Sequence, residues 1–193
     1  MPSRYPSLVI SLPEWVTAFM AARPASLATL EERMMLAISL ARENVNNGGG
    51  PFGAVIVETD CGKVVAPGVN LVVPLSSSLA HAEMVAIAIA QQLAGTYDLG
   101  APGLPALQLV TSTEPCAMCL GAIPWSGIKS VVCGACAEDA ESIGFDEGDK
   151  PGGWPEALAR RGIAMYRGIL TDEAAGVLAD YARDGGRIYN GTI

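Results

Sequence analysis

The residues best suited to chemistry are one histidine and two cysteines, whose types and spacing fit a bound metal ion. His81 is the only histidine of the chain, and Cys116 and Cys119 stand three positions apart directly after a proline. Cysteines three apart at a helix start present both sulfurs to one side, and the helix dipole favours their thiolate forms. Three protein ligands with a fourth position for water are typical of catalytic zinc, whereas structural zinc has four protein ligands. The pattern predicts one Zn²⁺ ion per chain, held by His81, Cys116 and Cys119.

Glu83 follows His81 by two residues and supplies the base that a catalytic zinc needs. Zinc lowers the pKa of a bound water, but a nearby group must still accept the proton and pass it to the substrate. Each residue also has an ordinary interpretation: a lone histidine can be structural, a cysteine pair can be buried or redox-active, and acidic residues are common in a first helical turn. The occurrence of all four residues at two predicted helix starts favours the catalytic interpretation.

The elements that must position these residues alternate between helix and strand along the chain. Capping patterns at Ser11 and Thr29, each with a glutamate three residues later, indicate helices that end near residues 22 and 46, the first with Pro13 in its first turn. Helices are also expected at 80–93, 115–125, 156–161 and 172–183, and strands at 52–58, 71–74, 108–113, 129–134 and 163–166, with another extended piece after the turn at 60–63. This order predicts an α/β fold, a three-layer α/β/α sandwich with a five-stranded mixed sheet.

Length, composition and charge limit the classes of function. The chain has 193 residues, half of them apolar, which is enough for one compact domain with a buried core. Its 12 Lys and Arg against 20 Asp and Glu give a net charge of -8, which disfavours nucleic acid as a partner. No apolar run approaches the ~18 residues of a membrane-spanning helix, and residues 1–10 lack the layout of a signal peptide. We therefore expect a cytoplasmic protein that binds neither nucleic acid nor membrane.

The two motifs together form the H-x-E and P-C-x-x-C signature of zinc nucleobase deaminases. The T-E-P-C run at 113–116 resembles the S/T-x-E-P-C run of the same enzymes. From about Met34 to the C-terminus, the chain resembles the cytidine-deaminase superfamily, which implies that fold and the hydrolysis of an exocyclic amino group from a nucleobase or similar nitrogen heterocycle. In such enzymes a zinc-activated water attacks the ring carbon, while the residue matching Glu83 moves the proton to a ring nitrogen and assists the departure of ammonia.

Within the superfamily, the chain is most similar to the bacterial guanine deaminases, whose relatives include enzymes acting on the s-triazine ammeline. The similarity rests on the G-P-F-G run at 50–53, on Asn70 after the second strand, and on the I-G-F-D-E run at 143–147. It implies that guanine is converted to xanthine and ammonia. A small free base as the substrate also agrees with the acidic charge of the chain.

The same resemblance offers candidate substrate contacts. Glu147 would accept hydrogen bonds from ring or amino N–H groups, or act as a second proton shuttle, and Asn70 would offer the base a donor and an acceptor. Phe52 and Phe145 would pack on the plane of the base, and Ala82, between the histidine and the general base, is a further candidate. Phenylalanines are usually core residues, however, and the acidic run after Phe145 could be a solvated turn.

Guanine deaminases of this type are dimers in which the C-terminal segment covers the neighbour's site. The resemblance therefore implies a homodimer, with residues 184–193 as a lid and Tyr189 as a substrate contact. Residues 1–193 are then one deaminase domain, with 1–28 as an N-terminal helical extension. The second C-x-x-C pair, Cys133 and Cys136, finds no further histidine, so we interpret it as two small buried side chains.

Several alternatives stay open from the sequence. Cytosine, cytidine and an s-triazine such as ammeline carry a similar amidine edge, and the size of a pocket is not visible in a sequence. A transfer-RNA adenosine deaminase shares the zinc signature, but its polyanionic substrate needs basic contacts. A non-enzymatic protein with structural zinc needs a fourth protein ligand and has no role for Glu83.

Overall fold

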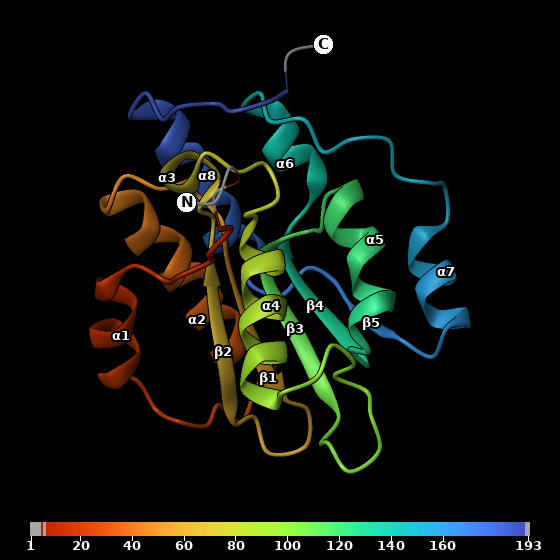
Figure 1. The fold of residues 1–193 in the computed structure, drawn as a ribbon. Coiled ribbons are helices and arrows are strands. Elements are labelled where there is room, and N and C mark those ends of the chain that lie inside the picture. The colour runs from red at the N-terminus through yellow and green to blue at the C-terminus, as the bar shows by residue number, and fades with distance from the viewer. Residues whose placement is uncertain (1–4, 6, 192–193) are drawn as a thin grey trace.

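A computed structural model describes residue 5 and residues 7–191, which form one five-stranded sheet with helices on both faces (Figure 1). The predicted α/β fold with a five-stranded mixed sheet is therefore confirmed. Residues 1–4, 6 and 192–193, which the predicted extension and lid include, lie outside the described residues. The strands are β1 (Gly53–Glu58), β2 (Val64–Val69), β3 (Leu107–Thr113), β4 (Ser130–Ala135) and β5 (Ala164–Tyr166). The helices are α1 (Glu14–Ala21), α2 (Leu30–Asn46), α3 (Val72–Leu75), α4 (Ala82–Ala94), α5 (Ala117–Ser126), α6 (Ala137–Ser142), α7 (Trp154–Arg160) and α8 (Thr171–Arg183).

The strand order β2-β1-β3-β4-β5 brings four strand ends to one edge of the sheet. β1 pairs antiparallel with β2 and β3, whereas β3, β4 and β5 run parallel. Gly53 at the start of β1 pairs with Val69 at the end of β2, and Ala54 pairs with Thr111 near the end of β3. The start of β1 and the ends of β2, β3 and β4 therefore lie together, next to the residues predicted to do chemistry.

Both faces of the sheet are buried, which explains why its strands are rich in Val and Ile. Alternate residues of a strand point to opposite faces. Val55 and Val57 pack in one apolar cluster with α2 and α8, while Ala54 and Ile56 pack in a second cluster with α4, α5 and α7. Figure 1 shows α4, α5 and α7 on the side of the sheet that faces the viewer. Among the described residues, no helix is both long and apolar enough to cross a membrane.

The two predicted capping patterns have different outcomes. The Thr29 hydroxyl accepts the N–H of Glu32 at 3.1 Å, and the Glu32 carboxylate accepts the N–H of Thr29 at 3.2 Å, which confirms the second capping box. The first is wrong, because α1 begins after Pro13 and no side chain caps it. Pro13 precedes the helix instead of lying in its first turn, so Ser11 is too far back to reach the free N–H groups.

Two short helices also differ from the prediction. Residues 71–74, predicted as a strand, belong to the turn that forms α3, and the second strand is the extended piece before them. A short apolar run does not distinguish strand from helix by periodicity, so tertiary contacts decided this segment. The turn-rich stretch after β4 contains α6, whose start is capped by the Asp139 carboxylate accepting the N–H of Cys136 at 2.9 Å.

Gly68 lets α4 lie close against β2. A Cβ atom at this position would lie 2.2 Å from the carbonyl oxygen of Ala82 and 2.6 Å from the backbone nitrogen of Ala86. Both are backbone atoms of α4, which cannot turn aside as the end of a flexible side chain can. The bare backbone at residue 68 therefore fixes the distance between the sheet and the helix that follows His81.

Replacing this glycine tests the close approach. We expect Gly68→Ala to push α4 away from the sheet and to lower the free energy of unfolding by about 1–3 kcal/mol. Gly121→Ala is the matched control, because nothing lies within 4 Å of its added Cβ in α5, and it should leave stability unchanged or raise it by up to about 1 kcal/mol. Urea unfolding compares the two variants, and equal midpoints would show that α4 does not depend on this contact.

Candidate active site

The three predicted zinc ligands lie at the starts of two helices. His81 immediately precedes α4 and Cys116 immediately precedes α5, both with an extended backbone, and Cys119 lies in the first turn of α5. Neither His81 nor Cys116 uses its side chain to cap its helix. α5 begins at Ala117, two residues later than predicted from Pro115, because Cys116 is not yet helical. All three side chains are thus free to face one point.

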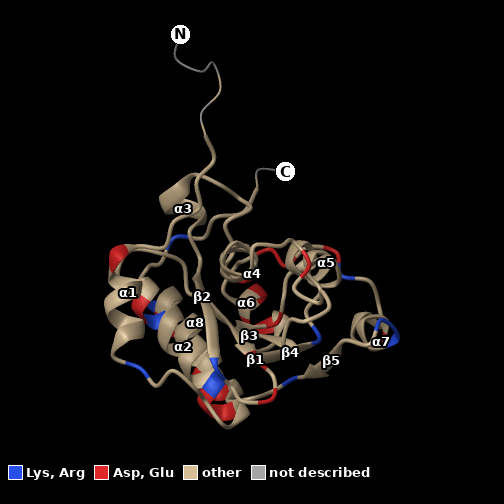
Figure 2. Cartoon of the chain, turned by 60° about the horizontal axis from the view of Figure 1, so that its bottom comes forward, with Lys and Arg blue, Asp and Glu red and all other residues tan. Residues whose placement is uncertain are grey.

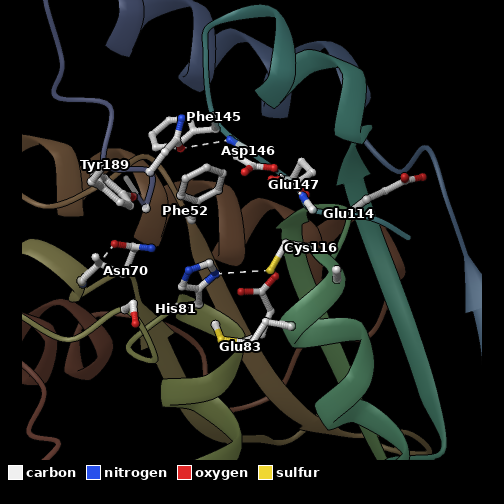
Figure 3. A pocket seen from close by; sticks show the side chains of 17 residues that line it. Phe52, Asn70, His81, Glu83, Glu114, Cys116, Phe145, Asp146, Glu147 and Tyr189 are labelled. Carbon is white, nitrogen blue, oxygen red and sulfur yellow. Dashed lines mark hydrogen bonds between the residues drawn. The ribbon is translucent and has the colours of Figure 1, made fainter. Parts of the chain in front are cut away.

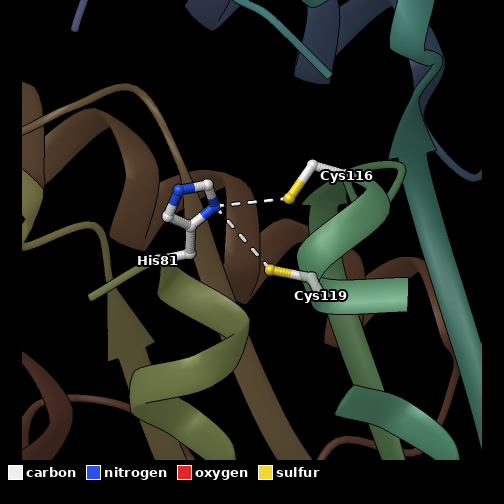
Figure 4. Close-up of side chains that lie close together, drawn as sticks. All are labelled: His81, Cys116 and Cys119. Carbon is white, nitrogen blue, oxygen red and sulfur yellow. Dashed lines mark hydrogen bonds between the residues drawn. The ribbon is translucent and has the colours of Figure 1, made fainter. Parts of the chain in front are cut away.

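The distances between the ligand atoms fit a tetrahedral zinc ion. The Nδ1 atom of His81 lies 3.5 Å from the sulfur of Cys116 and 3.7 Å from the sulfur of Cys119 (Figure 4). Zinc bonds of about 2.0 Å to nitrogen and about 2.3 Å to sulfur place such atoms about 3.5 Å apart in a tetrahedral site. All three ligand atoms lie within 4.8 Å of one another. The predicted ligand set is confirmed as a zinc site.

No fourth protein ligand joins this group among the described residues, where it is the only cluster of three or more His, Cys, Asp or Glu side chains suited to a metal. The second cysteine pair lies elsewhere. Cys133 is fully buried in the sheet, as predicted, whereas Cys136 is only half-buried and donates its thiol hydrogen to Asp139 at 3.0 Å. Three ligands without a fourth are the pattern of a catalytic zinc.

The sulfurs influence each other's ionisation. A hydrogen bond from Cys119, with a further one from His81, lowers the pKa of Cys116 to about 4 against the opposing effect of burial. The hydrogen bond to Cys116 and burial raise the pKa of Cys119. Burial lowers the pKa of His81, but hydrogen bonding to Cys116 and the charge of Glu83 outweigh it, so that this pKa is raised. Two adjacent sulfurs disfavour a second thiolate unless a cation balances them.

Glu83 lies beside the ligands and is almost completely buried, with 7% of its surface exposed (Figure 3). It belongs to the first turn of α4. Burial raises the pKa of Glu83, and the negative charge of Cys116 raises it further, whereas His81 lowers it. A buried carboxylate with a raised pKa, next to metal ligands but outside the ligand group, has the properties of a proton acceptor.

Two of the ligands, His81 and Cys116, open onto a cavity of about 340 Å³, a size that suits a small molecule. Of the predicted site residues, those that line it are Phe52, Asn70, His81, Glu83, Cys116, Phe145, Glu147 and Tyr189. Carboxylates also line it, whereas no Lys or Arg among the described residues does. In Figure 2 the Lys and Arg residues are dispersed over several elements. The cavity therefore favours a ligand with N–H donors over one that carries phosphate.

One predicted contact is not brought to the cavity. Ala82 is completely buried in the apolar cluster between α4 and the sheet, and it is not among the residues that line the cavity. The position after His81 points back into the core because α4 starts there. We therefore do not retain the Ala82 side chain as a substrate contact.

Three aromatic side chains form one wall of the cavity. The rings of Phe52 and Phe145 meet edge to face with centroids 5.0 Å apart, and the rings of Phe145 and Tyr189 do the same at 5.0 Å. Phe145 is also stacked on Tyr181 of α8. Phe52 and Phe145 therefore both pack with the core and face the cavity. The sequence left open whether they are core residues or residues of the site, and their positions are compatible with both.

The described C-terminal segment lies across the cavity of its own chain. Asn190 accepts the N–H of Asp146 at 3.0 Å and donates to the carbonyl oxygen of Gly144 at 2.8 Å. The Tyr189 hydroxyl is buried and has no hydrogen-bond partner among the described residues. The segment therefore lines the cavity through residues 189–191. Its role as a lid and its exchange with a neighbouring subunit stay predictions.

Asn70 is held by a residue that the sequence did not single out. The side-chain amide of Asn44, buried in α2, donates to the carbonyl oxygens of Gly50 and Asn70, each at 2.9 Å. The Asn70 side chain in turn accepts the N–H of Val72 at 3.2 Å. One amide therefore joins the glycine-rich run to the end of β2. Asn44 was not predicted because its contact with Asn70 joins residues that are 26 positions apart in the chain.

Glu147 lies on the opposite side of the cavity from Asn70 (Figure 3), with 6% of its surface exposed. Its backbone oxygen accepts the N–H of Ala117 at 2.9 Å, which attaches its loop to the start of α5. The Lys150 amine lies 3.7 Å from its carboxylate, too far for a hydrogen bond, and donates to the carbonyl oxygen of Pro115 at 3.3 Å. Burial and the charge of Cys116 raise the pKa of Glu147 to about 8, against the opposing charge of Lys150.

Glu114 also lines the cavity, although the sequence marked it only as part of a motif. It is buried and forms an ion pair with Arg167, whose guanidinium lies 5.6 Å from the centre of the Trp154 ring. The sequence signal that could have identified Glu114 is its position directly before Pro115 and the zinc ligand Cys116. Its partner follows β5 and could be found only from the fold.

Residues 27–135 match the family described as the cytidine and deoxycytidylate deaminase zinc-binding region, which is more than half of the chain. This chain belongs to that family. The matched range includes all three zinc ligands and Glu83. The chain is therefore a zinc-dependent deaminase.

The relatives of this deaminase include guanine deaminases. That of Bacillus subtilis (strain 168) is 42% identical over 143 residues, covering 70% of this chain and 83% of the relative. A solved guanine deaminase from Nitrosomonas europaea is 45% identical with a TM-score of 0.88, covering 92% and 97% of the two chains. A solved complex with 2,6-diaminopurine is 46% identical with a TM-score of 0.90, covering 95% and 97%. The tRNA-specific adenosine deaminase of Bacillus subtilis (strain 168) is 31% identical over 151 residues, covering 78% and 87%.

The ligand set predicts how zinc binding responds to substitution. Cys119→Ala should lose most of the bound zinc, because two remaining ligands hold zinc weakly. Cys133→Ala is the matched control: it removes an equally buried thiol from the neighbouring strand and should keep one zinc per chain. Elemental analysis by mass spectrometry after dialysis measures both. Full zinc retention by Cys119→Ala would contradict the ligand assignment.

Proposed function

We propose that this deaminase hydrolyses guanine to xanthine and ammonia. The observation that carries the proposal is the acidic cavity of about 340 Å³, which Glu147 lines together with the zinc ligands His81 and Cys116. Guanine presents several N–H donors to such a wall and carries no phosphate. The high identity to proteins named guanine deaminases supports the same substrate.

Glu83 is the proposed general base. When zinc is bound, it supplies a Lewis acid that makes a water nucleophilic near neutral pH. Glu83 takes one proton from that water as the new C–O bond forms at the ring carbon bearing the amino group. It would pass this proton to a ring nitrogen. A second proton, from the hydroxyl of the tetrahedral carbon, would then move through Glu83 to the amino nitrogen, so that the C–N bond breaks, C=O forms and ammonia leaves. The burial of Glu83 keeps bulk water from competing for these protons.

Recognition of the base is assigned to the cavity walls. Glu147 would accept hydrogen bonds from ring and amino N–H groups, with Lys150 balancing its charge. Asn70, held by Asn44, would pair with polar atoms on the opposite edge of the base. Phe52 and Phe145 would restrict the bound molecule to a flat ring. The buried Tyr189 hydroxyl, in the C-terminal segment, would offer it one further hydrogen bond.

The alternatives differ in what the cavity must accommodate. Cytosine and ammeline share the amidine edge of guanine and stay as the competing substrates. A transfer RNA substrate is disfavoured, because no Lys or Arg among the described residues lines the cavity. A structural zinc is disfavoured by the absence of a fourth ligand among those residues. We further propose that the protein acts as a homodimer on free bases in the cytoplasm.

A panel of bases tests the reaction and the general base together. Ammonia release is measured with guanine, ammeline, cytosine, adenine and their nucleosides, and guanine should react fastest. Glu83→Gln should keep its zinc and lose activity by about 10²–10⁴-fold, because the amide cannot accept the proton. Glu141→Gln, the same change at an exposed position of α6, should behave as the wild type. Full activity in Glu83→Gln would remove this residue from the mechanism.

A second substitution tests the recognition of guanine. Glu147→Gln should lower kcat/KM for guanine by roughly 100-fold with zinc still bound, because the amide replaces one acceptor oxygen by a donor and cannot shuttle a proton. Asp149→Asn removes a charge from an exposed residue of the same loop and should leave the kinetics unchanged. If both variants match the wild type, Glu147 does not contact the substrate.

A further inference from the structure

The carboxylate of Glu83 has a hydrogen-bond partner outside the cavity. The Thr111 hydroxyl in β3 donates to the Oε1 atom of Glu83 at 3.2 Å. Thr111 is 1% exposed and is not among the residues that line the cavity. A bound substrate would therefore meet Glu83 from the cavity side while Thr111 holds it from the sheet side.

The position of Thr111 is fixed by strands on both sides. It pairs with Ala54 of β1 in one direction and with Cys133 of β4 in the other. Its side chain points to the same face as Leu109, two residues earlier, which packs in the cluster with α4 and α5. The hydroxyl thus lies on the central strand of the sheet, whereas Glu83 lies on a helix that packs against this sheet.

The Thr111 hydroxyl is the side-chain group that holds this carboxylate. Among the described residues, no other side-chain O–H or N–H group has a hydrogen bond to Glu83. The orientation of the Glu83 carboxylate therefore depends on this contact.

We propose that Thr111 is a positioning residue for the general base: its hydroxyl holds Oε1 of Glu83, so that Oε2 is the oxygen that exchanges protons in the cavity. The inference rests on the proposed role of Glu83. It adds a residue from β3 that contacts neither zinc nor substrate. A carboxylate free to rotate would spend part of its time with neither oxygen directed at the reacting atoms, and such misplacement slows the chemical step.

The chain offers a matched control two residues along the same strand. The Thr113 hydroxyl points to the same face, is buried, and has no hydrogen-bond partner among the described residues. Thr113 also does not line the cavity. Thr111→Val and Thr113→Val therefore make the same change in size and polarity, and only the first removes a bond to Glu83. Thr111→Ser keeps the hydroxyl and removes a methyl group.

The test measures kcat and KM for the base that the wild type deaminates fastest, together with zinc content and urea unfolding of each variant. Thr111→Val should lower kcat by about 10- to 100-fold, with KM within about twofold and one zinc per chain. Thr111→Ser should recover kcat to within a few-fold of the wild type. Thr113→Val should match the wild type in kcat and unfold at the same or a higher urea concentration.

Three results would overturn the inference: a kcat for Thr111→Val close to that of Thr113→Val, a Thr111→Ser variant as slow as Thr111→Val, or loss of zinc or fold in Thr111→Val. The last would show that the hydroxyl supports the structure instead of the base. Failure of the proposed function looks different, because the wild type itself would then release no ammonia from any base of the panel.

Discussion

Coordination of one cation by His81, Cys116 and Cys119 is the interaction on which the rest of the site depends. Two sulfurs and the Glu83 carboxylate lie close together in a buried space, where like charges raise one another's pKa. A divalent cation balances two thiolates and leaves the Glu83 carboxylate free for its proposed role as proton acceptor. The same cation joins the starts of α4 and α5, which carry every ligand. The same ion would therefore balance the charge of the two thiolates and fix the starts of the two helices relative to each other.

The sheet supports this arrangement by bringing strand ends from distant parts of the chain to one edge. α4 and α5 pack on the same face, and Gly68 sets how closely α4 approaches. Loops after β2 and around residues 145–150 then add two further walls, with Asn70 and Glu147 on opposite sides of the cavity.

Much of this could be predicted from the sequence because the zinc motifs are short and local. A single histidine and one C-x-x-C pair after a proline left little choice of ligands, and the capping box at Thr29 depends only on neighbouring residues. Thr111, Asn44 and Lys150 could not be predicted, because each acts through a partner far along the chain or through a loop of irregular shape. The strand predicted at 71–74 was wrong for a related reason: a short apolar run takes the conformation that its surroundings select.

The incorporation of oxygen from solvent tests the central claim most directly. The zinc-loaded protein is incubated with guanine in water enriched in ¹⁸O, and the products are analysed by mass spectrometry. Hydrolytic deamination predicts xanthine that carries one ¹⁸O atom, together with one ammonia for each guanine consumed. Unchanged guanine, or a product without the label, would contradict hydrolysis of this base at the site formed by His81, Cys116, Cys119 and Glu83.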